Sequence, residues 1–378
     1  MKARALLVLA TVAAGVIGLA PAALADGVVL VADSTSFLAN IDDDAGVCQA
    51  RAKQIVADAA PREQAQDQAF YQRRKELEEL AKTDPTGAEQ QFQELQRQHR
   101  IEQYQTDRDL AACNDAADEV VNGPRDELDL TKLHLWSSTG GEVVIPAHTH
   151  VFIKRANWEI LRPGTKLDAA ELRHGVELGL EGTDVIRDSA VWDGRVTVRF
   201  GNASVTLKEA PLITQNDTQP VEQVFAADRG KNAPDFDKTL ADAVPGLRKV
   251  DLGDDKWMQD VLEPMYETRD GHGMRVLLTS VDSAHRDSSR AAWTQLAGPD
   301  VAALHVEHAF NPNEKEGYNS LGNLETIPPT PGHPRGQIIV GGQPAPEIMT
   351  LLRSQGVQDP LVLDSTWLNV GHVDEFVQ

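Results

Sequence analysis

The stretch "LLRSQGVQDPLVLDSTWLNVGHVDEF" at residues 351–376 decides how the last third of the chain is interpreted. A helical segment, a turn and an apolar strand lead into three ionisable residues, His372, Asp374 and Glu375. His372 and Asp374 are two residues apart, so on a strand both side chains would face the same side. The spacing therefore predicts a polar pocket that both side chains enter, next to an apolar core.

Two earlier stretches have the same character. "DKWMQDVLEPMY" (255–266) and "NSLGNLETIPP" (319–329) also place carboxylates beside apolar side chains, and the second of them contains a turn glycine. Around these stretches, helical and strand segments alternate from about residue 211 onward, which predicts an α/β domain. No G-x-G-x-x-G or P-loop motif occurs, so nothing in the sequence supports nucleotide binding.

Together these stretches resemble the catalytic domain of the protein-arginine deiminases (peptidyl-arginine deiminases). "RAAWTQLAGPDV" (290–301) and "HPRGQIIVGG" (333–342) extend the similarity, which runs from about residue 200 to 378. The resemblance implies calcium-dependent hydrolysis of peptidyl-arginine to peptidyl-citrulline and ammonia. It also implies that residues 206–378 form the first part of an α/β propeller, the guanidine-modifying enzyme fold.

The resemblance assigns roles to four residues. Asp260 and Asp374 would hold the guanidinium of the substrate, which stays charged and presents five hydrogen-bond donors. His372 would be the acid–base residue, and Trp257 would line the aliphatic stem of the arginine. Three of the four have an ordinary structural alternative: a helix cap for Asp260, a salt bridge for Asp374 and core packing for Trp257.

Ca²⁺ is the cofactor that the resemblance implies. Its ligands would be three side chains, Gln259, Glu263 and Glu325, and the backbone carbonyls of Leu321 and Leu324. Carboxylate, amide and carbonyl oxygens together suit a hard cation that takes six or more ligands.

The nucleophile of the family is a cysteine well past the His-x-Asp pair, and no cysteine follows Cys113 here. We therefore expect no citrulline formation by this chain alone, either because the sequence is a fragment of an enzyme or because it is a truncated, inactive protein. A secreted non-catalytic binding protein with a vestigial deiminase domain is the alternative from another class. A small-molecule deiminase or amidinotransferase is a third hypothesis, and the preceding β-rich region argues against it.

The first half of the chain predicts a different architecture. Strand-like segments at 27–41 and 134–210 predict an immunoglobulin-like β-sandwich over 26–205, which is loosely similar to the middle domain of the family. Residues 46–120 are rich in Gln, Glu, Arg and Ala with sparse apolar residues at helical spacing, which predicts a helical hairpin insertion of open purpose. "DDDAG" (42–46) lacks the spacing of a calcium loop, so it is predicted to be a solvated turn.

The N-terminus and the overall charge indicate where the protein acts. Lys2 and Arg4, an apolar run and an A-x-A site at 23–25 predict a signal peptide over 1–25 and hence a secreted protein. In that compartment the two cysteines, Cys48 and Cys113, are expected to form a disulfide. The net charge of −22, from 58 acidic and 36 basic residues, argues against nucleic acid and favours Ca²⁺ or arginine-containing proteins and peptides as partners.

Overall fold

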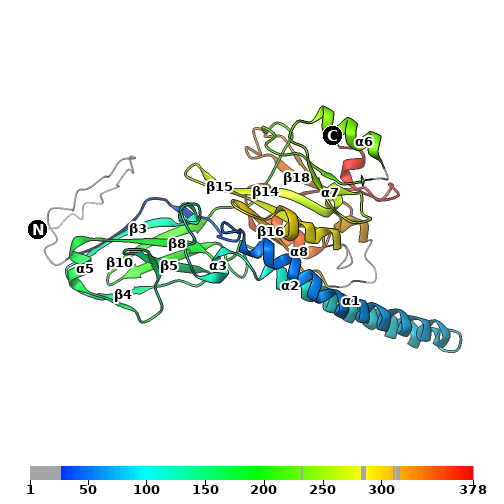
Figure 1. Cartoon of the computed structure of the whole chain (residues 1–378), viewed down its shortest axis with the longest axis horizontal. Coiled ribbons are helices and arrows are strands. Elements are labelled where there is room, and N and C mark those ends of the chain that lie inside the picture. The colour runs from blue at the N-terminus through cyan, green and yellow to red at the C-terminus, as the bar shows by residue number, and fades with distance from the viewer. Residues whose placement is uncertain (1–26, 231–232, 282–286, 310, 312–315, 378) are drawn as a thin grey trace, which may run out of the picture.

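A computed structural model describes residues 27–230, 233–281, 287–309, 311 and 316–377, so the predicted signal peptide lies outside the described residues. The described chain forms an N-terminal β-rich unit, a C-terminal α/β unit and a long helical hairpin beside the junction of the two (Figure 1). Within these ranges, no helix combines the length and the apolar character that crossing a membrane requires.

The N-terminal unit is built from two five-stranded sheets that share one core. In spatial order the first sheet contains β1 (Val28–Ala32), β3 (Thr131–Ser137), β8 (Val176–Gly182), β5 (Thr149–Lys154) and β6 (Trp158–Ile160). The second contains β2 (Ser36–Phe37), β10 (Ala203–Glu209), β9 (Arg195–Phe200), β4 (Gly141–Val144) and β7 (Lys166–Leu167).

The core of this unit follows the period of two that the sequence predicts for strands. In β3 every second side chain is buried, including Leu133 and Leu135, and they meet Val198 and Phe200 from β9 of the other sheet. Short helices complete the unit: α3 (Asp115–Asp118), α4 (Asp126–Asp129) and α5 (Ala169–His174). Two sheets packed in this way are compatible with a β-sandwich, and the immunoglobulin-like type stays a prediction.

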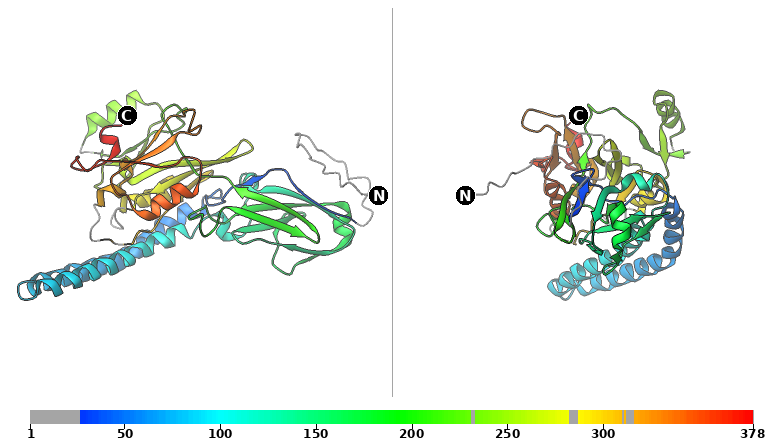
Figure 2. Two further views of the ribbon diagram at one scale, coloured as in Figure 1. Left: turned by 180° about the vertical axis from the view of Figure 1, so that it is seen from behind. Right: turned by 90° about the vertical axis from the view of Figure 1, so that its left-hand side faces the viewer.

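The helical hairpin leaves this unit between β2 and β3 and extends away from it (Figures 1 and 2). It consists of α1 (Val47–Leu80) and α2 (Pro85–Ala111), which pack along each other. The turn between them ends where Oδ1 of Asp84 accepts the Gly87 N–H at 2.9 Å, with Pro85 as the first helical residue. At the base, the predicted disulfide between Cys48 and Cys113 is confirmed, with a sequence separation of 65 residues.

A buried ion-pair network attaches the hairpin to the C-terminal unit. The Arg290 guanidinium donates from Nε to Oδ1 of Asp107 at 2.9 Å and from Nη2 to Oε1 of Glu63 at 2.8 Å. Arg290 and Asp107 are both buried, so each charge depends on the other for compensation. The hairpin is therefore fastened to the α/β unit near its base, while its far end projects into solvent.

Within the described residues, the C-terminal unit contains three sheets. In spatial order they are β11 (Ile213–Thr214), β14 (Leu262–Arg269), β15 (His272–Thr279) and β16 (Val301–Leu304); β17 (Leu324–Ile327), β18 (Gln337–Gly341) and β19 (Leu361–Leu363); and β12 (Phe225–Ala227) with β13 (Arg248–Val250). The helices are α6 (Pro234–Ala243), α7 (Met258–Val261), α8 (Pro346–Ser354) and a π-helix, η3 (Ala292–Leu296). Single turns of 3₁₀-helix are η2 (Asp287–Arg290), η4 (Glu316–Asn319), η5 (Leu321–Asn323) and η6 (Val373–Glu375).

One hydrophobic core joins the two units. Met265, Val276 and Val340 of the C-terminal sheets pack in the same cluster as Ala39 and Val185 of the N-terminal unit. The mixture of helices and several sheets agrees with the α+β class predicted for the chain, and the propeller arrangement stays a prediction.

Candidate active site

Two carboxylates and an imidazole, from two distant parts of the sequence, lie close together beside Gly322. Nδ1 of His372 lies 3.6 Å from Oδ1 of Asp260 and 4.0 Å from Oδ1 of Asp374. A Cβ atom placed on Gly322 would lie 2.6 Å from Oδ2 of Asp374 and 2.7 Å from Oδ1 of Asp260. Glycine is therefore needed at this position, because any side chain would enter the space in which the three groups face one another.

Three short helical segments bring these groups together. Asp260 lies on α7, Gly322 on η5 and Asp374 on η6, and η5 contacts both of the other two. The prediction that His372 and Asp374 share one face of a strand is wrong. The strand β19 ends at Leu363, and His372 directly precedes the turn η6.

The turn around His372 is held by the side chain of Glu375. Its Oε1 accepts the backbone N–H groups of Gly371 at 2.9 Å and of His372 at 3.0 Å. This capping arrangement satisfies backbone donors that the short turn leaves unpaired. It therefore holds in place the turn that contains Asp374.

Asn323 is a supporting residue that the sequence analysis missed. Its buried side chain donates to the carbonyls of Tyr318 at 2.9 Å and Gly341 at 2.8 Å. Its Oδ1 accepts the N–H groups of Gly341 at 2.9 Å and Val373 at 3.2 Å. One amide thus connects η5 to β18 and η6. The sequence feature that could have indicated this role is a polar residue between Gly322 and the apolar start of β17.

The imidazole of His372 has a defined proton arrangement. Nε2 lies 2.7 Å from the carbonyl oxygen of Gly317, which only accepts hydrogen bonds, so Nε2 carries a hydrogen. Nδ1 is then the ring nitrogen that faces Asp260 and Asp374. The ring is buried, whereas the side chain of Asp374 is 35% exposed, so the cluster opens to solvent on the Asp374 side.

Burial raises the pKa of Asp374, the charge on His372 lowers it, and the neighbouring carboxylate of Asp260 raises it further. Two carboxylates held this close repel each other unless a cation lies between them. Trp257, directly before α7, exposes 58% of its surface, so it is not the core residue of the structural alternative. The arrangement suits a positively charged, partly apolar ligand that enters from solvent.

The predicted calcium ligands adjoin this cluster: Gln259 precedes Asp260 on α7, and Glu325 is close enough to feel the charge of Asp374. Nε2 of Gln259 donates to Oε2 of Glu263 at 3.0 Å. Burial, with the charge of Glu325 added, raises the pKa of Glu263 well above its usual range. Burial raises the pKa of Glu325 to about 7, and Asp374 contributes to this shift. Leu321 and Leu324, whose carbonyls complete the predicted set, flank the same turn, so the oxygen donors fit a hard cation that would neutralise the two glutamates.

A second acidic cluster lies where the two units meet. Asp42, Asp44 and Asp129 each offer a carboxylate oxygen within 4.8 Å of the others, and so do Asp129, His272 and Asp300 through their ligand atoms. The prediction of a solvated turn at 42–46 is wrong, because Asp42 is only 1% exposed. The sequence concealed this cluster because its members come from four segments that are separated along the chain.

The second cluster also has the features of a cation site. Oδ1 of Asp42, Oδ2 of Asp129 and both carboxylate oxygens of Asp44 are buried without a hydrogen-bond partner in the described part of the chain. Burial raises the pKa of Asp44 to about 7, and the charges of Asp129 and Asp300 add to this shift. Buried acceptors of this kind are costly unless a cation or a proton compensates them, so these acidic groups are suited to hold a metal ion.

Two acids and a buried histidine at an opening to solvent are suited to bind a cationic group. Comparison with known proteins shows which family this part of the chain resembles. Residues 200–378 match the family model described as protein-arginine deiminase (PAD), so this part of the chain is similar to that family.

Curated relatives agree with the family model. The chain is 31% identical to protein-arginine deiminase type-1 of Mus musculus over 200 residues, which is 46% of this chain and 29% of the relative. It is 31% identical to the type-4 enzyme of Homo sapiens over 194 residues, and 27% identical to the human type-3 enzyme over 193 residues. Each of these matches covers 46% of this chain and 28% of the relative, so the match spans less than a third of the relatives' own length.

Proposed function

We propose that this chain carries the arginine-binding and proton-transferring part of a calcium-dependent protein-arginine deiminase. Such an enzyme converts peptidyl-arginine and water to peptidyl-citrulline and ammonia. The observation that carries the proposal is the convergence of Asp260, Asp374 and Nδ1 of His372 above Gly322, in a segment that matches the family.

The chemistry explains the residue types. A guanidinium stays protonated at physiological pH, so its burial requires compensating carboxylates, and Asp260 and Asp374 supply them. A thiolate forms a bond to the central guanidinium carbon, and a C–N bond breaks as Nδ1–H of His372 protonates the departing ammonia. Water then attacks the same carbon while Nδ1 takes one of its protons. The C–S bond breaks to restore the thiolate and release citrulline, and the second proton of the water passes to solvent.

The thiol for this reaction is not available among residues 1–378. The chain has two cysteines, and both are joined in the disulfide at the base of the hairpin. We infer that the nucleophile is contributed by polypeptide outside residues 1–378, either continuous with this chain or separate from it. This part of the chain then binds and protonates the substrate but does not attack it.

Calcium is proposed at both acidic clusters. Beside the active site, Gln259, Glu263 and Glu325 would hold it with the two backbone carbonyls, and its charge would stabilise the ionised forms of the buried acids. At the junction of the two units, the carboxylates around Asp42 and Asp129 would hold a second ion. The predicted signal peptide and the disulfide support a secreted enzyme that meets calcium at extracellular concentrations.

A binding experiment tests the substrate proposal without turnover. Calorimetry with calcium and a blocked arginine amide should show binding, and the blocked citrulline amide, which is neutral, should not bind. Asp374→Asn should weaken the binding at least tenfold, because one of two charge-assisted contacts to the guanidinium is lost. Equal affinity of the arginine and citrulline compounds would contradict the proposal.

An activity experiment tests the reaction. The chain alone should release no ammonia from a blocked arginine peptide, even with excess calcium. A fusion to the segment of mouse type-1 deiminase that follows the matched region should release ammonia and citrulline. If the fusion binds arginine peptides but never turns them over, the alternative of a non-catalytic binding protein is favoured.

A further inference from the structure

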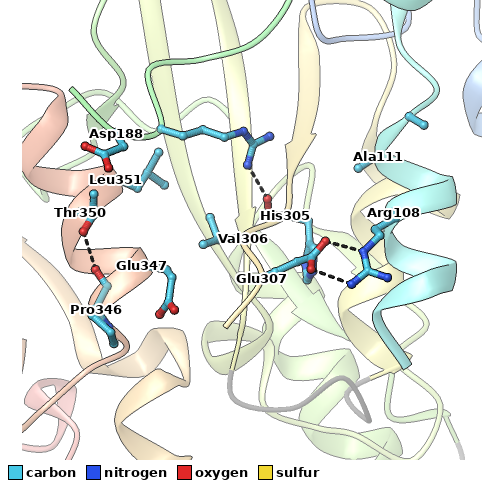
Figure 3. Close-up of a pocket in the computed structure, with 12 residues that line it drawn as sticks. Arg108, Ala111, Asp188, His305, Val306, Glu307, Pro346, Glu347, Thr350 and Leu351 are labelled. Atoms are coloured by element: carbon cyan, nitrogen blue, oxygen red, sulfur yellow. Dashed lines mark hydrogen bonds and ion pairs between the residues drawn. The ribbon is translucent and has the colours of Figure 1, made fainter. Parts of the chain in front are cut away.

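A separate recess lies where the hairpin base, the N-terminal unit and the C-terminal unit meet (Figure 3). Its volume is about 770 Å³, enough for a substantial ligand or a length of polypeptide. No residue of the candidate active site lines it. A binding function of this recess would therefore be distinct from the deiminase site.

The recess has aliphatic side chains on opposite walls. The last turn of α2 contributes Ala111 and the following Ala112, and α8 contributes Leu351 from the opposite side (Figure 3). Between the two helices lies Val306, and Pro346 begins α8. An apolar stem between these side chains would be removed from water on both sides.

The two arginines that line the recess are already engaged. Nε and Nη2 of Arg108 donate to the two carboxylate oxygens of Glu307 at 2.6 and 2.7 Å. Arg187 donates from Nε to Oδ2 of Asp184 at 2.6 Å and from Nη1 to the carbonyl of His305 at 2.8 Å. Their positive charges are thus compensated within the protein and attract an anion only weakly.

Two other acids in the recess are compensated less fully: Asp188 has no ion pair in the described part of the chain, and Glu347 pairs with a histidine. Asp188 accepts the N–H of Ala190 at 2.8 Å, and Glu347 contacts Nδ1 of His308 at 2.6 Å. In the described part of the chain, neither carboxylate forms an ion pair with a lysine or an arginine. The recess therefore keeps net negative charge on the side of Asp188 and α8, next to the aliphatic walls.

We propose that this recess binds a lysine or arginine side chain of an extended basic polypeptide. The aliphatic stem would lie against Val306 and Leu351, and the cationic head would lie between Asp188 and Glu347. The net charge of −22 would favour the approach of such a polypeptide. Resting on the proposed function, the recess would be a second attachment point for the arginine-containing protein that the active site modifies.

A lysine–glycine repeat peptide tests this proposal, because it has no guanidinium for the active site. Calorimetry with the calcium-saturated chain should show binding that the double variant Asp188→Asn and Glu347→Gln weakens about fivefold or more, the upper range for a partly exposed charge pair. The matched control, Glu78→Gln with Glu79→Gln, removes two exposed acids at the hairpin tip and should change the affinity less than twofold.

A second variant places a cation in the recess. Ala112→Arg puts an arginine at the C-terminal end of α2, where the helix dipole tolerates positive charge, so the fold should be preserved. It should weaken binding of the lysine peptide about fivefold without lowering the melting temperature.

Unchanged affinity in both recess variants would overturn the proposal, as would tighter binding of a glutamate–glycine peptide. Asp374→Asn should leave the lysine peptide bound, so the result separates this recess from the deiminase site.

Discussion

The two acidic clusters of this protein contain the same types of side chain but differ in their exposure to solvent. At the active site, Asp374 is 35% exposed and has a histidine beside it, so its charge is partly screened. At the junction of the units, Asp42 and Asp129 are 1% and 0% exposed and have buried oxygens without a hydrogen-bond partner. An open cluster can exchange its ligand, whereas a closed cluster requires a permanent one.

This difference in exposure predicts that one cluster acts in catalysis and the other in the stability of the fold. The active-site acids remain partly solvated when no substrate is bound, so the folded state tolerates the empty site. The junction acids lie between elements of both units, and their repulsion acts on the arrangement of those units. Loss of an acid in the first cluster should affect catalysis, and loss of the cation in the second should affect stability.

The largest effect is expected for Asp260→Asn in the active fusion enzyme. The amide keeps the shape of the side chain but removes half of the charge that compensates the guanidinium, so turnover should fall about a thousandfold. The unfolding midpoint should stay near that of the parent. Asp364→Asn, an exposed acid on the segment before His372, is the matched control and should keep full activity. Comparable losses in both variants would argue against a specific role for Asp260.

Calcium removal should have the next largest effect, on stability. Chelation leaves the junction acids without a counter-ion, and a ligand present at about a hundred times its dissociation constant contributes about 2.7 kcal/mol. Thermal unfolding should show a melting temperature that falls on addition of chelator and recovers with excess calcium. In Asp129→Asn this recovery should be smaller. A melting temperature that is indifferent to calcium would refute a closed metal site at the junction.

Much of the active site could be predicted from the sequence because its residues lie in short motifs. Asp260, His372 and Asp374 were found through stretches that resemble one family, and the structure places them together. The local geometry was not predictable in the same way. His372 precedes a 3₁₀ turn held by Glu375, and a two-residue spacing does not distinguish such a turn from a strand.

The junction cluster could not be predicted, because it depends on tertiary contacts between segments far apart. Asp42, Asp129 and Asp300 are separated by the hairpin and by most of both units. "DDDAG" alone has the composition of an exposed turn, and its first residue is buried because the fold places it against Asp115 and Asp300. The hairpin was predictable from composition, whereas its attachment through Arg290 was not.

A pair of buried acids outside both clusters extends the comparison, because its effect on stability should depend on pH. Burial raises the pKa of Glu267 well above its usual 4.5, and Glu209, whose pKa is raised by burial and by Glu267, lies nearby. From pH 4.5 upward the unfolded chain therefore binds fewer protons than the native chain, and the free energy of unfolding decreases. Glu267→Gln removes this loss while its amide oxygen can still accept the Ala39 N–H.

The Glu267→Gln variant should match the parent in free energy of unfolding at pH 4.5 and exceed it at pH 7.5, because the parent alone loses stability as pH rises. Urea unfolding at both pH values, with calcium held constant, measures the difference. Equal stability of variant and parent at every pH would show that Glu267 is ionised in the native state and compensated by another group.

The smallest effect on stability is expected for an acid that is exposed to solvent and also forms an ion pair. Glu307 forms a bidentate ion pair with Arg108, and the two side chains are 45% and 37% exposed. Solvent screens this pair, so Glu307→Gln should lower the free energy of unfolding by less than about 1 kcal/mol. Urea unfolding in low and high salt measures the effect, which should disappear in high salt. A larger loss that persists in salt would mean that the hairpin and the α/β unit depend on this pair, as they depend on the buried contacts of Arg290.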